Sequence, residues 1–365
     1  MFFMNKRILF VAPHRLGRNP GQRFRFEQYI PYLQANGFDC EISNLLSQQD
    51  DAIFYQKGHY IAKLYIYFKC IFIRLRDVLR CKSFNIVFIY REALFTRSNI
   101  FERLFCRLNK HVFVDFDDAI FLLDISRANK RLHWLKNPQK INKTLEKCSL
   151  AIVGNEYLAA YARQYGHDVR IFPTTLDLST IHIYPQQKNL DKICIGWIGS
   201  TTTIKHLEWA EPILRAIYKI YGDKVFFKVV ADVPLKMENL PIVNVTWTKE
   251  RESYELSSFD IGIMPLPDNE WTRGKCGFKG LQCMAYEIPV VMSPVGVNMD
   301  IIQDGENGFL ADMVTEWVEK VSLLIDNAEM RTLMGKNGRK TVEEHYSYQA
   351  LKDTYLSYFN EFCLC

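Results

Sequence analysis

The sequence predicts an α/β protein with two doubly wound parallel sheets, and three observations lead to that prediction. Short apolar segments alternate with segments of helical spacing in the first half, and the second half repeats this plan. Such alternation is typical of parallel sheets with helices on both faces. The 365 residues are enough for two domains, each with its own core. The stretch “HIYPQQKNLDK” is the linker candidate, which places the boundary near residue 185.

The first domain is expected over residues 1–185. Its strands are predicted at “KRILFVAP”, “FDCEIS”, “FNIVFIY”, “HVFVDF”, “LAIVG” and “DVRIFP”. Helical spacing occurs in “QRFRFEQYIPYLQANG” and near residues 59–82, 97–109, 136–148 and 155–165. Each helical segment connects two strands, as a parallel sheet requires.

The second domain is expected over residues 186–346. Its strands are predicted at “KICIGWIG”, “KVFFKVVA”, “IVNVTW”, “DIGIMPL”, “IPVVMSP” and “NGFLA”. Between the first two, a helix is predicted that buries Leu207, Ala210, Leu214, Ile217, Tyr218 and Tyr221 and stops at Gly222. After Gly338 we expect helix with a break at “HYSYQ”, and the last helix, 347–362, is expected to pack on the first domain. A cleft between the domains, at the carboxyl ends of their strands, would hold the ligand.

Positive charge is concentrated in one segment, residues 63–82, “KLYIYFKCIFIRLRDVLRCK”. Its six cations against Asp77 account for the whole formal net charge of +5, so the remainder is close to neutral. A nucleic-acid-binding protein typically shows a broader basic field, so no nucleic-acid partner is expected. Two interpretations of the segment stay open: a helix lying on an anionic membrane surface, or a helix whose apolar face packs on the first sheet.

The ten cysteines include no CxxC pair and no Cys/His spacing typical of zinc sites. The apolar N-terminus is interrupted by Asn5, Lys6 and Arg7, so it predicts a first strand and not an export signal. No run of eighteen uncharged apolar residues occurs. We therefore expect a cytoplasmic protein, at the inner face of the cytoplasmic membrane if residues 63–82 contact lipid.

Three loops of the second half connect a predicted strand to a helix start: “GSTTTIK”, “RGKCGFKG” and “VGVN”. Backbone N–H groups at helix starts and lysine side chains both favour anions, and a diphosphate suits such a site. The residues expected to bind it are Gly199, Ser200, Thr201, Lys205, Lys275, Gly277, Phe278, Lys279, Gly296, Val297 and Asn298. The alternative for each one alone is ordinary: a solvated lysine, a turn glycine or a helix cap.

Charged residues also follow strands of the first half. “VFVDFDDAIF” contains Asp115, Asp117 and Asp118 at a strand end. Asp115-Phe116-Asp117 matches the short DxD pattern that binds a divalent metal, but three interpretations stay open. The aspartates hold a metal, they contact hydroxyl groups of a substrate through Asp117 and Asp118, or they cap strand ends.

The remaining first-half candidates suit a substrate that carries phosphate. Arg91 and Glu92 follow a strand, and Arg23 and Arg25 start a helix. An internal arginine–carboxylate pair is the alternative for these arginines. Asn155 is first of all a helix N-cap. His14 and His111 are expected to be ordinary core or surface histidines.

The second half resembles the donor-binding domain of glycosyltransferase family 4, retaining enzymes of the GT-B fold, in which two Rossmann-like domains face a central cleft. The resemblance rests on “WIGSTTTIKHLEWA”, on the segment from “FDIGIMPLPDNEW” to “NGFLA”, and on “MRTLMGKNGRKTVEEHYSY”. In the first half, “PGQRFRFEQYIPYLQANGF”, “VGNEYLAAYA” and “FPTTLD” resemble the family's acceptor-side domain. The resemblance implies that Asp117 and Asp118 contact acceptor hydroxyls or the transferred sugar, and that the acceptor side includes Arg23, Arg25, Arg91, Glu92 and Asn155.

Two departures from the family pattern concern the donor site. The family's paired glutamates fall on Gly274 and Gln282, and the arginine of its first loop falls on Ser200, whereas the lysine is retained as Lys205. Gln282 can still hydrogen-bond a ribose, since its amide both donates and accepts. Trp247 is a candidate for the base pocket, with core packing as its alternative.

The resemblance implies a retaining transferase that uses a UDP- or GDP-sugar without a metal or other cofactor. Lys205, Lys275 and Lys279 would stabilise the leaving phosphate, and the acceptor would be a glycan or lipid-linked glycan in surface polysaccharide assembly. Three alternatives remain: a catalytically degenerate nucleotide-binding or partner subunit, a metal-dependent transferase centred on Asp115 to Asp118, and a sugar-nucleotide epimerase of similar fold.

Overall fold

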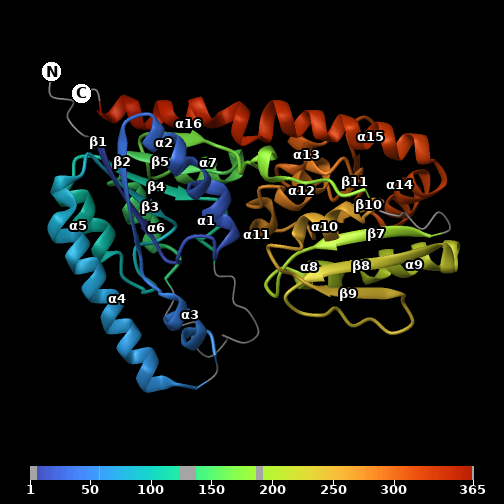
Figure 1. Ribbon diagram of the computed structural model, residues 1–365, viewed down its shortest axis with the longest axis horizontal. Helices are drawn as coiled ribbons and strands as arrows, with labels where there is room; N and C mark the ends of the chain where they lie inside the picture. Colours follow the sequence, from blue (N-terminus) through green and yellow to red (C-terminus); the bar gives the residue numbers. More distant parts are fainter. Residues whose placement is uncertain (1–5, 57, 123–136, 186–191, 364–365) are drawn as a thin grey trace. The chain divides into compact units, whose positions relative to one another are not determined.

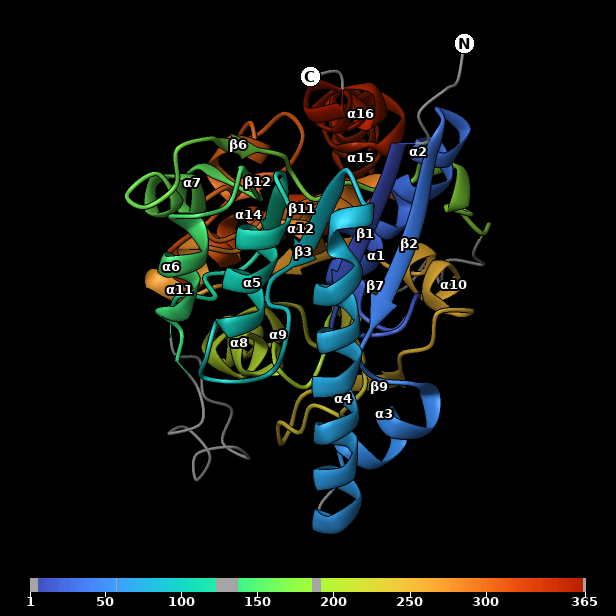
Figure 2. The ribbon, with the colours of Figure 1, turned by 90° about the vertical axis from the view of Figure 1, so that its left-hand side faces the viewer.

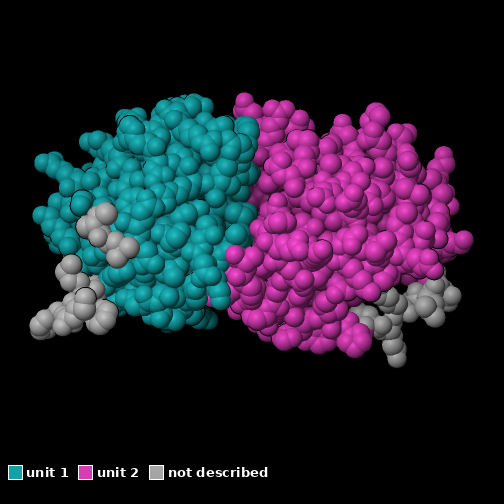
Figure 3. Space-filling model, turned by 90° about the horizontal axis from the view of Figure 1, so that it is seen from above, with its two compact units in different colours: residues 1–175, 351–365 teal, residues 176–350 magenta. Residues whose placement is uncertain are grey.

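The computed structural model describes residues 6–56, 58–122, 137–185 and 192–363. The chain divides into two compact units, one of residues 1–175 with 351–365 and one of residues 176–350 (Figure 3). Residues 186–191 of the predicted linker lie outside the described residues.

The first unit is built on a six-stranded parallel sheet, as the alternating pattern predicted (Figure 1). Its strands are β1 (Lys6–Ala12), β2 (Phe38–Asn44), β3 (Ile86–Tyr90), β4 (Val112–Phe116), β5 (Leu150–Val153) and β6 (Val169–Ile171), in the order β2-β1-β3-β4-β5-β6. The strand order reverses between β1 and β3. In sheets of this kind, ligands bind beyond the carboxyl ends of the strands at such a reversal.

The helices of this unit are α1 (Pro20–Arg25), α2 (Ile30–Ala35), α3 (Gln48–Phe54), α4 (Tyr60–Arg80), α5 (Ile100–Leu108), α6 (Lys140–Leu145) and α7 (Glu156–Ala162). The single helix predicted from “QRFRFEQYIPYLQANG” is two helices joined by a 3₁₀ turn, Glu27–Tyr29. Phe26 leaves the helical region at φ −138°, and Pro31 at the start of α2 has no N–H to continue the ladder.

The last helix, α16 (Tyr348–Cys363), joins the first unit from Leu351 onward. Tyr355 and Phe359 are fully buried there. The Tyr355 ring stacks on Tyr29 at 4.2 Å between centroids, and Phe359 contacts the rings of Phe88 and Phe113 on the sheet. The end of the chain therefore completes the aromatic core of the unit that the start of the chain begins.

The second unit contains another six-stranded parallel sheet, again as predicted. Its strands are β7 (Ile193–Ile198), β8 (Val225–Ala231), β9 (Ile242–Thr246), β10 (Ile261–Met264), β11 (Val290–Met292) and β12 (Phe309–Leu310), in the order β12-β11-β10-β7-β8-β9. The reversal here falls between β7 and β10. These two strands are therefore the ones whose following loops should flank a ligand.

The helices of the second unit are α8 (Ile204–Trp209), α9 (Glu211–Tyr221), α10 (Glu252–Ser257), α11 (Glu270–Arg273), α12 (Phe278–Ala285), α13 (Asn298–Ile301), α14 (Val314–Asp326) and α15 (Ala328–Thr341). The one helix predicted after β7 is two, α8 and α9, which meet at Ala210 just before Pro212. Its predicted core face is confirmed, and α9 ends at Gly222 with φ +52°. The predicted break near “HYSYQ” is a π-helical turn, Val342–Tyr346.

Candidate functional site

The three predicted anion-binding loops follow β7, β10 and β11, which are neighbouring strands in the second sheet. Because the strands are parallel, their carboxyl ends lie at one edge of the sheet. The first and second loops flank the strand-order reversal between β7 and β10. The topology thus places Lys205 at the same edge of the second sheet as Lys275 and Lys279, although it is far from them in the sequence.

The first loop, Gly199 to Thr203, is shaped by an aromatic ring. A Cβ atom on Gly199 would lie 2.0 Å from the ring of buried Trp197, so a side chain there would displace the tryptophan. The Thr201 N–H donates to Asp232 Oδ1 at 2.5 Å and its hydroxyl to Oδ2 at 2.6 Å, while the Ser200 N–H donates to Thr203 Oγ1. Two groups predicted to bind the anion therefore have protein partners in this structure.

Asp232, at the end of β8, was missed by sequence reasoning. Its carboxylate accepts both the backbone and the side-chain donor of Thr201, 31 residues away, and so holds the first loop. The sequence does place Asp232 directly after a buried strand, at the same sheet edge as the loops, and that position was the available signal.

The second loop begins after α11 and ends at Gly277, which precedes α12 with φ +64°. Lys275 Nζ lies 5.1 Å from the centroid of the Trp271 ring. Lys279 Nζ lies 5.9 Å from the ring of Trp197, the residue that underlies the first loop. Trp197 thus connects the first loop to the lysine of the second.

The third loop packs directly against the second. Gly296 has φ +55°, and a Cβ atom there would lie 2.5 Å from the carbonyl oxygen of Arg273. A Cβ atom on Gly277 would meet Ile301 at 2.2 Å and Asn298 Oδ1 at 3.3 Å. Gly296 is needed because the Arg273 backbone approaches it too closely for a side chain, and Gly277 because the Ile301 side chain fills the space; both also have positive φ.

One predicted contact in the third loop needs correction. Asn298 is only 1% exposed, and its Nδ2 donates to the carbonyl of Ser293 at 2.9 Å. Its side chain therefore holds the loop from inside. Gly296 and Val297 remain the candidates of this loop, and both are partly exposed.

The base and ribose candidates lie on different elements. Trp247 follows β9, two strands away from β7, and its indole N–H donates to Glu252 Oε2 at 2.7 Å. Gln282 is largely buried within α12, and Gly274 closes α11. Phe278 is the first residue of α12 and is half-buried.

In the first unit, a charged cluster lies at the carboxyl ends of β3 and β4. Arg91 Nη2 is 2.6 Å from Asp117 Oδ1 and 2.6 Å from Asp118 Oδ2, and the Tyr90 hydroxyl donates to Asp117 at 3.1 Å. Arg91 has φ +59°, a strained conformation for a residue with a side chain. Burial alone would lower the pKa of the Arg91 guanidinium, but Asp117 and Asp118 reverse that effect and raise it.

Arg25 is not an acceptor contact, which corrects the prediction. Its guanidinium forms a two-point ion pair with Asp115, at 3.0 and 2.6 Å, and both side chains are 0% exposed. It also donates to the carbonyl of Phe172. The internal arginine–carboxylate alternative therefore describes Arg25.

The Arg25 pair also bears on the metal interpretation. Both oxygens of Asp115 accept hydrogen bonds from Arg25, so the Asp115-Phe116-Asp117 pattern does not present two open carboxylates. Within the described ranges, no group of three or more His, Cys, Asp or Glu side chains is arranged to hold a metal ion. The chemistry of these side chains gives the metal-dependent alternative no support.

The other first-half candidates also have partners within the protein. Glu92 forms an ion pair with Lys140, and the Arg23 guanidinium lies 4.7 Å from the Phe24 ring. Asn155 is a buried N-cap whose Oδ1 accepts from the Leu158 N–H at 2.9 Å. His111 contacts the ring of Phe362.

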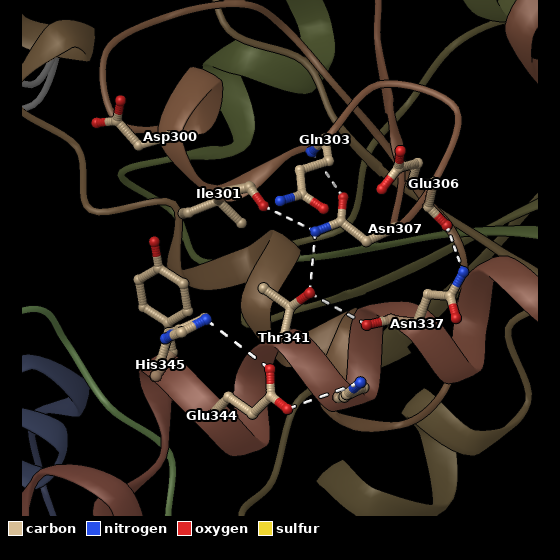
Figure 4. A pocket seen from close by; sticks show the side chains of 11 residues that line it. Asp300, Ile301, Gln303, Glu306, Asn307, Asn337, Thr341, Glu344 and His345 are labelled. Atoms are coloured by element: carbon tan, nitrogen blue, oxygen red, sulfur yellow. Dashed lines mark hydrogen bonds and ion pairs between the residues drawn. The ribbon is translucent and has the colours of Figure 1, made fainter.

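A separate polar hollow of about 510 Å³ lies between α13 and α15 of the second unit (Figure 4). Asn307 crosses it, with Nδ2 donating at 3.0 Å to the Ile301 carbonyl and to Thr341 Oγ1. Acidic side chains, Asp300, Glu306 and Glu344, mix there with Lys340 and His345, and none of the loop lysines lines it. The three loops, and not this hollow, therefore form the candidate site.

Comparison with known proteins finds relatives for part of the second unit. Residues 192–327 match the family model of “Glycosyl transferases group 1”. The capsular polysaccharide biosynthesis glycosyltransferase CapM of Staphylococcus aureus is 32% identical over 88 residues, 24% of this chain and 23% of that protein. Trehalose synthase of Thermococcus litoralis is 27% identical over 144 residues, 39% of this chain and 33% of the other. The matches thus cover about a quarter to a third of these relatives' length.

Solved structures resemble nearly the whole chain. Sucrose-phosphate synthase from Thermosynechococcus elongatus superposes with a TM-score of 0.71 at 14% identity, over 98% of this chain and 99% of that one. Anabaena HepE in complex with UDP and glucose gives 0.66 at 13% identity, over 97% and 99%. The finer assignment to family 4 stays a prediction. The chain therefore has the GT-B fold, and residues 192–327 of its second unit match the glycosyl transferases group 1 model.

Proposed function

We propose that this protein is a retaining glycosyltransferase that moves a sugar from a UDP- or GDP-sugar to a glycan or lipid-linked glycan in surface polysaccharide assembly. One observation carries the proposal. Loops after three neighbouring strands of a group 1 domain bring Lys205, Lys275 and Lys279 to one sheet edge, at the strand-order reversal. The printed names of CapM and of the HepE complex with UDP and glucose fit the same substrate classes.

The lysines would bind the diphosphate and stabilise the charge that grows on it as it leaves. Lys279 lies in the first turn of α12, where the helix dipole also favours an anion. Loss of one such donor typically lowers turnover by about 10²–10³, or roughly 3–4 kcal/mol. The ammonium groups of these lysines carry the positive charge that a diphosphate favours.

In the proposed reaction the acceptor hydroxyl attacks the anomeric carbon from the face that the diphosphate leaves. The new bond joins the acceptor oxygen to the anomeric carbon, the bond from that carbon to the phosphate oxygen breaks, and the leaving phosphate takes the hydroxyl proton. No protein nucleophile or metal is required. In the first unit, Arg91, Asp117 and Asp118 would hydrogen-bond the acceptor or the transferred sugar.

A second candidate function is a catalytically degenerate nucleotide-binding subunit. The observation that favours it is the absence of carboxylates at Gly274 and Gln282, where the family's paired glutamates fall. Donor consumption distinguishes the two. A degenerate subunit binds the nucleotide but does not release it from a sugar nucleotide during prolonged incubation, with or without an acceptor.

The testing experiment is calorimetric titration of UDP, GDP and ADP, with and without EDTA. The proteins are the wild type, Lys205→Ala/Lys275→Ala/Lys279→Ala, and Lys336→Ala as a matched control on exposed α15 surface. We expect one nucleotide to bind without metal, the triple variant to lose at least about tenfold in affinity, and the control to match the wild type.

Other results would contradict the proposal in distinct ways. Binding that disappears in EDTA would assign the diphosphate to a metal held by carboxylates. If the triple variant and the wild type bound nucleotide with equal affinity, the three lysines would not be part of the nucleotide site. Binding of no nucleotide would leave a partner-protein role ahead of sugar transfer.

A further inference from the structure

Helix α4 turns a continuous apolar side to solvent. Ile61, Leu64, Tyr65, Phe68, Phe72, Leu75 and Leu79 recur at spacings of three and four residues, and form what we call the apolar stripe. Their exposed fractions run from 42% for Leu75 to 87% for Ile61. An amphipathic helix on a soluble protein normally buries such a stripe, so its exposure over the full length of α4 needs an explanation.

The opposite side of α4 packs on the first unit although it carries charge. Arg74 and Asp77 are both 0% exposed and form an ion pair at 2.9 Å. Arg74 also donates to the carbonyls of Ala93, at 2.6 Å, and Ala12, at 2.9 Å. Turning the helix to bury the apolar stripe would break this buried network, so the packing fixes which side faces outward.

The sequence alone left two interpretations of this segment, which one helix can satisfy together. The helix does pack on the first unit, through Ile66, Cys70 and Val78 as well as the ion pair. The apolar stripe, however, is not the packing side. Figures 1 and 2 show α4 along the outside of the first unit beside α5, with its beginning near α3.

The exposed charged side chains of α4 itself are positive, although Arg76 lies 3.2 Å from Asp77 Oδ1 and Arg80 pairs with Glu41, whose side chain is 36% exposed. The single acidic residue of α4 is Asp77, which is buried. The Arg76 side chain is 61% exposed, Lys69 is partly exposed beside Asp50, and Lys82 is exposed just after the helix. An apolar side with aromatic rings and a cationic rim complements lipid with anionic headgroups.

We propose that α4 is a membrane-docking helix that lies flat on a bilayer surface containing anionic lipid, with the apolar stripe inserted at the headgroup boundary. Among the described residues, no helix is long and apolar enough to cross a membrane. A second copy of the chain fits this side less well, because pairing two such sides would bring two positive rims together. The inference does not depend on sugar transfer, and its test does not involve nucleotide.

The test is co-sedimentation with phosphatidylcholine vesicles, with and without about one third phosphatidylglycerol, at low and high salt. The stripe variant is Tyr65→Gln/Phe72→Gln/Leu79→Gln, three side chains at least 70% exposed. The matched control, Ile220→Gln/Leu323→Gln/Leu333→Gln, removes three exposed apolar side chains from helices of the second unit. Thermal unfolding checks that each variant is folded.

We expect the wild type and the control to bind the anionic vesicles, and the stripe variant to bind at least about tenfold more weakly. The charge variant Arg76→Gln/Lys82→Gln should lose about fivefold per cation on anionic vesicles, and high salt should weaken the wild type similarly. Three results would overturn the inference: the wild type does not bind vesicles, the stripe variant binds them as strongly as the wild type, or wild-type binding is the same with and without phosphatidylglycerol. If sedimentation shows that the wild type is a dimer and the stripe variant a monomer, the surface is assigned to a second copy of the chain instead.

Discussion

His14, two residues beyond the end of β1, should lose its proton far below the ordinary pH range of histidine. Its backbone is held by Gln22, whose side chain accepts from the His14 N–H and donates to the His14 carbonyl, both at 2.9 Å. The ring lies beside Tyr55 and Phe95, and its buried Nδ1 has no hydrogen-bond partner in the part of the chain that is described. Sequence reasoning treated His14 as ordinary, although it follows a buried strand at the sheet's strand-order reversal.

The environment lowers the pKa of His14 from 6.5 to about 4, chiefly through burial. Asp51 opposes the shift, whereas Arg18 and Arg91 add to it. Between pH 6.5 and 4 the unfolded chain therefore binds a proton that the folded chain does not, so stability is full above pH 6.5 and falls as the solution becomes more acidic. Integrated from pH 7 to 5, this one group costs about 2 kcal/mol of unfolding free energy.

Two assays measure the effect. NMR titration of the imidazole resonances, with the His14 signal assigned by its absence in His14→Gln, should give a midpoint near pH 4. Urea unfolding monitored in the first unit should show that His14→Gln loses about 2 kcal/mol less than the wild type between pH 7 and 5. A midpoint between 6 and 7 would refute the reasoning, because it would mean that water solvates the ring.

Three further predictions concern the buried pair, the loop contact and metal. Arg25→Met should lower the free energy of unfolding by about 3–5 kcal/mol in urea, because it leaves Asp115 buried and unpaired. Adding Asp115→Leu should recover much of this loss. The control Arg23→Met should cost about 1 kcal/mol or less. A double variant no more stable than Arg25→Met would contradict the ion-pair argument. Gly296→Ala should cost more than about 2 kcal/mol and weaken nucleotide binding, because its φ is +55° and its methyl group would meet the Arg273 carbonyl at 2.5 Å; a thermal midpoint equal to the wild type's would show that the loops separate without cost. EDTA should leave nucleotide affinity unchanged in calorimetry, and a loss of binding would return the diphosphate to a metal site.

Both sheets could be predicted from the sequence because each strand and most helices are local patterns. Apolar runs and apolar residues at helical spacing indicate which side of a strand or helix avoids water, and this does not depend on the partner that the segment packs against. The position of the three predicted loops at one sheet edge was also predictable, because parallel strands bring their carboxyl ends to one edge. The two predicted helices that proved to be broken, before Pro31 and near Pro212, were misjudged because their apolar spacing continues across the break.

Residue pairing could not be predicted in this way. Arg25 and Arg91 both sit near strand ends in charged surroundings, but Arg25 is sealed against Asp115 while Arg91 joins Asp117 and Asp118. Asp232 reaches Thr201 only because β7 and β8 lie side by side. Such partners depend on strand order and register, which arise from contacts between distant parts of the chain.

Helix α4 shows most clearly which features the sequence determines and which ones tertiary packing decides. The sequence by itself determined that residues 60–80 form a helix with one apolar stripe and a concentration of cations. Only the tertiary structure decided that the stripe faces outward, because burial of Arg74 with Asp77 against backbone carbonyls orients the opposite side toward the sheet. Periodicity measures how residues are distributed around a helix, and only competition among all packing contacts selects the side that is buried.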